Sequence, residues 1–369
     1  MLKVLHHLPP ELAHRIAVRL LQIYGAMPVL SSDHSKKDIS CFGLSFTHRL
    51  GVAAGLDKNA VAYKGLMRMG FSFVEVGTVT PLPQLGSPLP RLFRLLEDGA
   101  VINRMGFNNR GIEALVQRVQ RDSPQRSAVL GINIGPNKDA PDPLQDYIAC
   151  FRRALPYADY FTINLSSPNT PGLRALQRGA GMRRLLQQIH AARQALAEET
   201  SLYPPMLIKV APDWDCDDDF YRLLDAGVAE GFDGFIVSNT TVSRPESVQS
   251  PYRQEIGGLS GAPLFALSTM YLARAYQHLG GAVPLVGVGG ISSQSDAILK
   301  LRAGASLLQV YSGLTISPKN IVSIFGRKYG NPRDEALFRS GVGEDMIGCD
   351  AGNLDQEEKL RLLTLSQND

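Results

Sequence analysis

The chain has 369 residues, of which 44% are hydrophobic and 20% charged, and this composition describes a soluble globular protein with a large core. Its length suits one large α/β barrel or two ordinary domains. The net charge of +3 is too small to favour a nucleic-acid partner, and the four cysteines (Cys41, Cys150, Cys216 and Cys349) form no C-x-x-C pair. We therefore expect no nucleic-acid partner, no metal site and no disulfide framework.

The first predicted element is an amphipathic helix within residues 1–40. Two prolines followed by Glu11 are typical of a helix start, because proline is tolerated in the first turn and an acid favours the positive end. Apolar residues then recur at helical spacing up to Tyr24. Such a helix usually packs on the rest of the protein, but its apolar face beside Arg15 and Arg19 also suits a membrane surface.

Eight short apolar runs follow, and most are separated by stretches with helical spacing. Near-continuous apolar strands that alternate with helices predict a parallel sheet covered on both faces, and eight such units favour a (β/α)8 TIM-type barrel over an open sheet. The runs are Gly51–Ala54, Phe73–Val76, Val129–Ile134, Tyr160–Ile163, Met206–Val210, Gly234–Ser238, Leu285–Val288 and Leu307–Tyr311. We predict a barrel over residues 41–325, preceded by the helical extension 1–40.

Polar residues gather where these runs end, on the face that carries the active site in barrels of this type. The fourth run leads into Asn164–Thr170, a loop of two amides, three hydroxyls and a proline that can read a small planar heterocycle. No His or Cys stands at a strand end. Ser167, Ser166, Thr170 or a lysine is therefore left as the group that transfers a proton.

Two further signals concern charge and phosphate. Lys209 lies inside an apolar strand, where a lysine without a partner is costly. Glycines at 287–290 and the segment Tyr311–Gly313 end the last two units, where barrels commonly hold a phosphate on backbone N–H groups. Tight turns without a ligand are the alternative, and we favour phosphate. The tail 326–369 lacks clear periodicity before Glu357, so we expect partial disorder with at most one short helix.

The ordered motifs resemble the dihydroorotate dehydrogenase family, in its class 2, quinone-linked branch, over roughly residues 1–320. Ser167, where the soluble class has cysteine, and the N-terminal extension indicate the class. After Gly313 the chain departs from the family pattern. The matching runs are Ala53–Lys58, Glu75–Pro81, Pro90–Arg94, Ile102–Asn109, Gly131–Gly135, Asn164–Arg174, Gly257–Gly261 and Gly287–Gly290.

The resemblance implies oxidation of dihydroorotate to orotate in pyrimidine synthesis, with FMN as hydride acceptor. A membrane quinone would re-oxidise FMN at the extension of a peripheral protein on the cytoplasmic face of the inner membrane. Catalysis is implied for Ser167, helped by Thr170 and Phe107. Substrate contacts are implied for Lys58, Asn103, Arg104, Met105, Gly106, Phe107, Asn164, Asn169, Asn239 and Thr240. FMN contacts are implied for Ala54, Gly55, Leu56, Asp57, Lys58, Thr78, Asn133, Asn164, Lys209, Ser238, Gly261, Gly290, Tyr311 and Ser312.

Two other functions compete with this interpretation. A flavin- or phosphate-binding barrel without turnover would need no proton acceptor, so the set Ser167, Asn169 and Lys209 argues against it. A soluble dehydrogenase that uses fumarate or NAD would be expected to carry cysteine at position 167 and to lack the extension.

Overall fold

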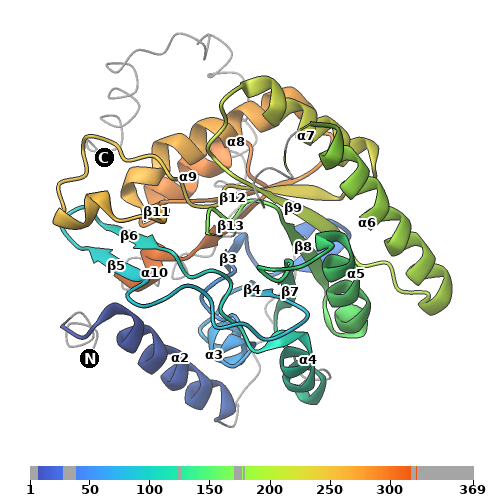
Figure 1. Cartoon of the computed structure of the whole chain (residues 1–369), viewed down its shortest axis with the longest axis horizontal. Helices are drawn as coiled ribbons and strands as arrows, with labels where there is room; N and C mark the ends of the chain where they lie inside the picture. Colours follow the sequence, from blue (N-terminus) through green and yellow to red (C-terminus); the bar gives the residue numbers. More distant parts are fainter. Residues whose placement is uncertain are drawn as a thin grey trace.

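The computed structural model describes residues 7–27, 39–122, 126–169, 177, 179–316 and 321. At its centre, eight parallel strands close into a barrel in the order β10-β12-β13-β3-β4-β7-β8-β9 (Figure 1). The predicted barrel is confirmed, because each predicted run forms one of these strands. They are β3 (Leu50–Val52), β4 (Phe73–Val79), β7 (Val129–Ile134), β8 (Tyr160–Asn164), β9 (Met206–Val210), β10 (Gly234–Val237), β12 (Leu285–Val288) and β13 (Leu307–Val310).

Helices surround the barrel and bury its outer face. Apolar side chains of strands and helices form one continuous core between the two layers. The helices are α3 (Tyr63–Arg68), α4 (Gly111–Asp122), α5 (Pro143–Ala154), α6 (Gly179–Thr200), α7 (Asp217–Ala229), α8 (Phe265–Leu279), α9 (Gln294–Arg302) and α10 (Ser312–Ile316). Short 3-10 turns lie at Leu155–Tyr157, Pro251–Gln254 and Ala262–Leu264.

A hairpin closes the amino end of the barrel. Its strands β1 (Ile39–Cys41) and β2 (Leu44–Phe46) pair antiparallel, and the Phe46 ring meets the edge of Phe73 with 5.5 Å between the ring centroids. These apolar side chains fill the barrel interior at its amino end. A polar ligand can therefore bind only at the opposite end, where the strands have their carboxyl ends.

A small antiparallel sheet stands over that carboxyl end. It consists of β5 (Leu92–Leu95), β6 (Ala100–Asn103) and β11 (Gly258–Gly261), with β6 in the middle. The sequence indicates only an insertion here, because β11 comes more than 150 residues after its partner β6. The register places Asn103 opposite Leu92 and Gly258, beside the barrel mouth.

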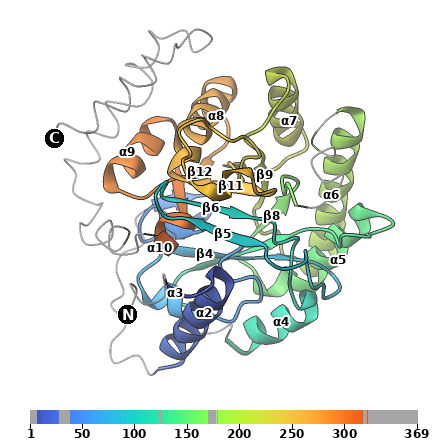
Figure 2. The same cartoon turned by 60° about the vertical axis from the view of Figure 1, so that its left-hand side comes forward.

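The predicted N-terminal helix is confirmed as α2 (Pro10–Ala26), which packs against α3 and β5 at the side of the barrel (Figure 2). The two helices approach closely because Gly65 has no side chain: a Cβ there would collide with the carbonyl oxygen of Leu21. The extension's first six residues and the predicted tail 326–369 lie outside the described residues.

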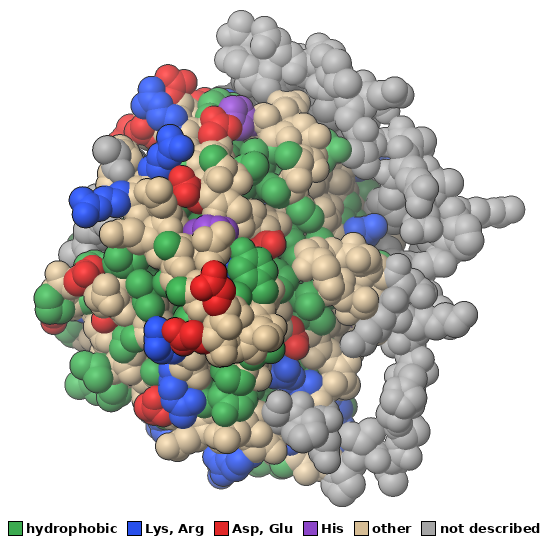
Figure 3. All heavy atoms as spheres, turned by 90° about the vertical axis from the view of Figure 1, so that its right-hand side faces the viewer, with side chains coloured by type: hydrophobic (Ala, Val, Ile, Leu, Met, Phe, Trp, Pro, Cys, Tyr) green, Lys and Arg blue, Asp and Glu red, His purple; other side chains and the backbone are tan. Residues whose placement is uncertain are grey.

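Several surface features bear on partners. Basic and acidic side chains are interspersed on the face shown in Figure 3, which is the right-hand side of Figure 1.

Among the described residues no helix is long and apolar enough to cross a membrane, and no cluster of three or more metal-ligating side chains occurs. Cys41, Cys150 and Cys216 are free thiols, while Cys349 lies outside the described residues.

Candidate active site

A cavity lies between the carboxyl ends of the barrel strands and the small sheet above them, and most of the predicted site residues line it. They are Ala54, Gly55, Lys58, Thr78, Asn103, Met105, Gly106, Phe107, Asn164, Ser167, Asn169, Lys209, Ser238, Asn239, Thr240, Gly290, Tyr311 and Ser312. The predicted residues described but outside the lining are Leu56, Asp57, Arg104, Asn133 and Gly261. Thr170 is not among the described residues.

The loop after β8 presents Ser167 to this cavity. The amide N–H of Asn169 donates to Ser167 Oγ over 3.3 Å, and the Asn169 side chain donates to Asn103 Oδ1 over 3.3 Å. Ser166 instead points to Asn164 Oδ1, which accepts from its hydroxyl at 3.1 Å, so Ser167 is the better placed of the two. Within the described residues, no carboxylate or imidazole is hydrogen-bonded to Ser167.

A buried carboxylate organises the floor of the cavity, and sequence reasoning missed it. Glu75 on β4 is fully buried and accepts hydrogen bonds from Asn133, Tyr160, Thr162 and Gln309 at 2.8–3.1 Å. The sequence does contain a signal for Glu75, because an acid inside an apolar strand is costly to bury without hydrogen-bond partners. Those partners come from three other strands, so no local pattern could have revealed the network.

Glu75 orients the predicted amides. Its partner Asn133 accepts from the Thr78 hydroxyl at 2.6 Å, and that hydroxyl accepts from Asn164 Nδ2 at 2.8 Å. Asn133 therefore does not line the cavity itself, and it orients Thr78 and Asn164, which do. Lys209 lies beside this network with 6% of its surface exposed, and burial lowers its pKa while the Glu75 charge opposes that shift.

The segment before α3 holds Lys58 at the cavity wall. Asp57 is buried and accepts from the backbone N–H groups of Val61 and Ala62 at 2.9 and 2.7 Å, which fixes the turn. Burial raises the pKa of Asp57, whereas these backbone hydrogen bonds lower it. Lys58 donates to the Gly55 carbonyl at 2.7 Å. Burial first, and then the charge of Arg91, lower the pKa of Lys58 to about 8.

Arg104 lies beside the cavity and turns away from it. Its guanidinium pairs with Glu255 at 2.6 Å and covers the Phe93 ring at 4.6 Å. In this structure it braces the sheet against the segment before β11. The neighbours that line the cavity are Asn103, Met105, Gly106 and Phe107.

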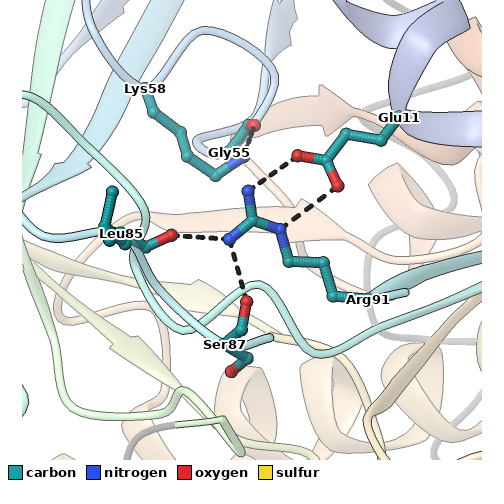
Figure 4. A network of polar contacts seen from close by, with 6 residues as sticks. All are labelled: Glu11, Gly55, Lys58, Leu85, Ser87 and Arg91. Carbon is teal, nitrogen blue, oxygen red and sulfur yellow. Dashed lines mark hydrogen bonds and ion pairs between the residues drawn. The ribbon is translucent and has the colours of Figure 1, made fainter. Parts of the chain in front are cut away.

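Arg91 joins α2 to the loops at the mouth (Figure 4). Its guanidinium donates to both carboxylate oxygens of Glu11, at 2.7 and 3.2 Å, and to the carbonyls of Leu85 and Ser87 at 2.6 and 3.1 Å. The N–H of Ser87 in turn donates to the Met105 carbonyl over 3.1 Å. The N-terminal helix is thus linked to a loop that lines the cavity.

A second, largely apolar cavity lies between α2 and the barrel. Burial, and then the Lys58 charge, lower the pKa of His14 in this wall to about 4, so the imidazole is neutral at pH 7. Tyr311 lines this cavity and also the first one. The residues that line this second cavity are Pro10, Ala13, His14, Ala17, Val18, Leu20, Leu21, Tyr24, Leu56, Leu66, Met69, Leu92, Arg94, Val101, Tyr311, Leu314 and Thr315.

Comparison with known proteins identifies the family. Residues 37–326 match the model of the family described as dihydroorotate dehydrogenase. A protein of Xanthobacter autotrophicus named dihydroorotate dehydrogenase (quinone) is 48% identical over 317 residues, which cover 85% of this chain and 88% of the relative. A protein of the same name from Bradyrhizobium diazoefficiens is 44% identical over 363 residues, covering 97% and 96%.

Solved structures agree with the sequence relatives. Ligand-free DHODH from Eimeria tenella superimposes with a TM-score of 0.82 at 38% identity, covering 91% of this chain and 99% of that one. The DHODH of the same organism in complex with ferulenol gives a TM-score of 0.82 at 37% identity, covering 92% and 96%. The resemblance read from the motifs is confirmed, and the chain belongs to the dihydroorotate dehydrogenase family, in its quinone-linked class of oxidoreductases.

Proposed function

We propose that this chain oxidises dihydroorotate to orotate at the barrel mouth, in pyrimidine synthesis, with FMN as bound cofactor and a membrane quinone as final electron acceptor. The observation that carries the proposal is the convergence of Ser167, Lys58 and Lys209 on one cavity, among the side-chain amides of Asn103, Asn164, Asn169 and Asn239. The cavity thereby combines a proton acceptor (Ser167), a cation that can bind a carboxylate (Lys58) and a buried cation that can face a cofactor ring (Lys209).

The cavity residues suit FMN. Gln309 lines the cavity, and its buried Oε1 has no partner among the described residues, so it can accept from an N–H of a ring. Gly289 and Gly290 both adopt positive φ, which lets the backbone approach a phosphate closely. When bound, FMN supplies the hydride acceptor. We assign its binding to Ala54, Gly55, Leu56, Asp57, Lys58, Thr78, Asn133, Asn164, Lys209, Ser238, Gly261, Gly290, Tyr311 and Ser312.

The reaction removes a proton from C5 of dihydroorotate and a hydride from C6, and a C5=C6 double bond forms. Ser167 takes the proton. A free serine is a weak base, so we assign to Phe107 and Thr170 a path that carries the proton onward. The Lys58 ammonium holds the substrate carboxylate. The remaining substrate contacts are assigned to Asn103, Arg104, Met105, Gly106, Asn164, Asn169, Asn239 and Thr240, and the Arg104 side chain contributes through the sheet that it braces.

The apolar cavity under α2 suits the quinone, because its wall is apolar and reaches Tyr311 of the cofactor cavity. In the second half of α2, Leu20 and Ile23 are 42% and 54% exposed, and Met27 directly after the helix is 53% exposed. An amphipathic helix that exposes such side chains can lie in a membrane interface. We assign residues 1–40 to quinone access, 41–325 to the FMN barrel and 326–369 to a separate tail, on a peripheral protein of the cytoplasmic side of the inner membrane.

Two half-reactions in one anaerobic cuvette test the proposal. Dihydroorotate should bleach the yellow full-length protein, and a long-chain quinone should restore the colour. A chain without residues 1–40 should still be bleached, yet should be re-oxidised slowly by quinone and should not sediment with vesicles. A yellow protein that dihydroorotate does not bleach would favour a binding barrel without turnover. Full-rate re-oxidation of the shortened chain, together with sedimentation, would remove the role given to α2.

A further inference from the structure

Lys300 on α9 is a buried cation to which the mechanism gives no role. Its side chain is fully buried, and its ammonium donates to Ser268 Oγ at 2.7 Å and to the Val288 carbonyl at 3.2 Å. Both acceptors are neutral. Burial lowers the pKa of Lys300 well below its ordinary value, with only the charge of Asp296 opposing the shift.

Among the described residues, Lys300 differs from the other buried cations in its lack of a nearby carboxylate partner. Arg193 has an ion pair with Asp233 at 2.8 Å, and Lys209 lines the cavity near Glu75. No carboxylate lies within ion-pair distance of Lys300 in the described part of the chain. The ammonium also lies over the Phe265 ring, 5.3 Å from its centroid, which gives a favourable contact but no countercharge. Because a buried charge without a counter-ion is costly, an ammonium here calls for an anion that the protein itself does not supply.

The groups that Lys300 contacts form the back of the glycine turn at the cavity. The Ser268 hydroxyl accepts from Lys300 and lies 3.1 Å from two carbonyl acceptors, those of Gly289 and Phe265, which share its one hydrogen. Val288, Gly289 and Gly290 line the cavity on the opposite side of this turn. There is no room between the turn and Ser268, since a Cβ on Gly289 would lie 2.7 Å from Ser268 Oγ. The ammonium is therefore one layer behind the cavity wall.

The start of α9, close to the glycine turn, carries a negative charge of its own. Ser293 is the N-cap of α9, and the carboxylate of Asp296 in the first turn accepts from the N–H groups of Ser292 and Ser293 at 2.8 and 2.9 Å. This carboxylate offsets the positive end of the helix. The positive charge that remains behind the turn is that of Lys300.

We propose that Lys300 is a positioning residue for the cofactor phosphate: its ammonium, behind the turn, holds Ser268 and Val288 and supplies the countercharge for a phosphate bound on the cavity side. The inference rests on the proposed function, in which the cofactor is FMN. Lys300 does not touch the phosphate; it acts through the turn and through space, where a low dielectric makes one charge felt across a layer of backbone.

Comparing two flavins isolates the phosphate. Full-length protein stripped of flavin is titrated with FMN and with riboflavin, which lacks the phosphate, and quenching of flavin fluorescence gives the two Kd values. Lys300→Met should weaken FMN binding roughly tenfold or more, a range set by charge-assisted interactions, and should change riboflavin binding only about twofold. The matched control is Arg302→Gln, an exposed cation two positions along α9, which should keep the wild-type preference for FMN.

The outcomes separate charge from packing. Equal losses for the two flavins, or no loss for either, would overturn the inference, because the lysine would then serve the turn alone. If Lys300→Met does not fold, Lys300→Gln carries the same comparison. The wild type gives a further test: its preference for FMN should change little with added salt, since a buried charge is weakly screened, and a steep fall would overturn the inference. A wild type without any preference for FMN would instead remove FMN from the proposed function.

Discussion

The ion pair between Glu11 and Arg91 should decide how firmly α2 docks on the barrel. The side chains are 24% and 11% exposed, and the guanidinium meets both carboxylate oxygens. Exposed pairs contribute about 0–1 kcal/mol and charge-assisted bonds about 1.5–3 kcal/mol, so this partly exposed pair should contribute about 1–2 kcal/mol. Of the 17 residues of α2 only Ala13 is buried, with 8% of its surface exposed, so apolar burial leaves room for the pair to contribute measurably to docking.

Glu11→Gln should therefore shift the docking equilibrium of α2 by roughly 5- to 30-fold. Hydrogen exchange of the α2 amides should speed up by that factor, and quinone re-oxidation should slow, while bleaching by dihydroorotate stays at the wild-type rate. The control is Arg19→Ala on the same helix, which removes an exposed hydrogen bond of 2.6 Å to Gln22. Unchanged exchange of α2 in Glu11→Gln would refute the reasoning.

Protonation of Glu11 at low pH should have the same effect on α2 docking as Glu11→Gln. The hydrogen bond from Arg91 lowers the pKa of Glu11 in the folded protein. A carboxylate with a depressed pKa contributes stability above its unfolded pKa and loses it as pH falls through the folded value. Protection of the α2 amides, measured against the intrinsic exchange rate at each pH, should therefore fall in the wild type as the pH drops below the ordinary range of a glutamate, and Glu11→Gln should lose this pH dependence.

Four further outcomes concern the proposed reaction and the tail. The pKa of Lys58 is lowered to about 8, and its ammonium is the group proposed to hold the substrate carboxylate. The wild-type kcat/KM should therefore fall as pH rises through 8, and the kcat/KM of Lys58→Met should be low at every pH, without this fall. Ser167→Ala should keep FMN but slow bleaching roughly 10²- to 10⁴-fold in stopped flow; near-normal bleaching would exclude Ser167 as the base. Lys209→Ala should lower flavin content and make the flavin potential more negative, and wild-type values of both would leave Lys209 a structural role only. Removal of residues from about 340 onward should spare FMN binding and turnover, and loss of the yellow colour would contradict this.

The sequence predicts the barrel well because parallel strands covered on both faces are continuous apolar runs, which can be recognised one at a time. The geometry of the fold brings their polar ends together, and this is why the sequence alone places Ser167 and Lys209 in one cavity. The small sheet escaped prediction because β6 pairs with β11, far along the chain. Glu75 and Arg104 show the same limit, since their partners are long-range and lie in other elements.

The shared wall at Tyr311 has a consequence for inhibitor resistance. A compound that fills the apolar cavity contacts a ring that also borders the proposed FMN cavity, and a Cβ on the neighbouring Gly55 would lie 3.3 Å from that ring. A substitution at Tyr311 that expels the compound also alters the wall of the proposed FMN cavity. Escape without loss of enzyme is therefore confined to residues that line the apolar cavity alone, such as Val18 and Leu21, and a compound that draws most of its affinity from Tyr311 would leave the organism few viable routes to resistance.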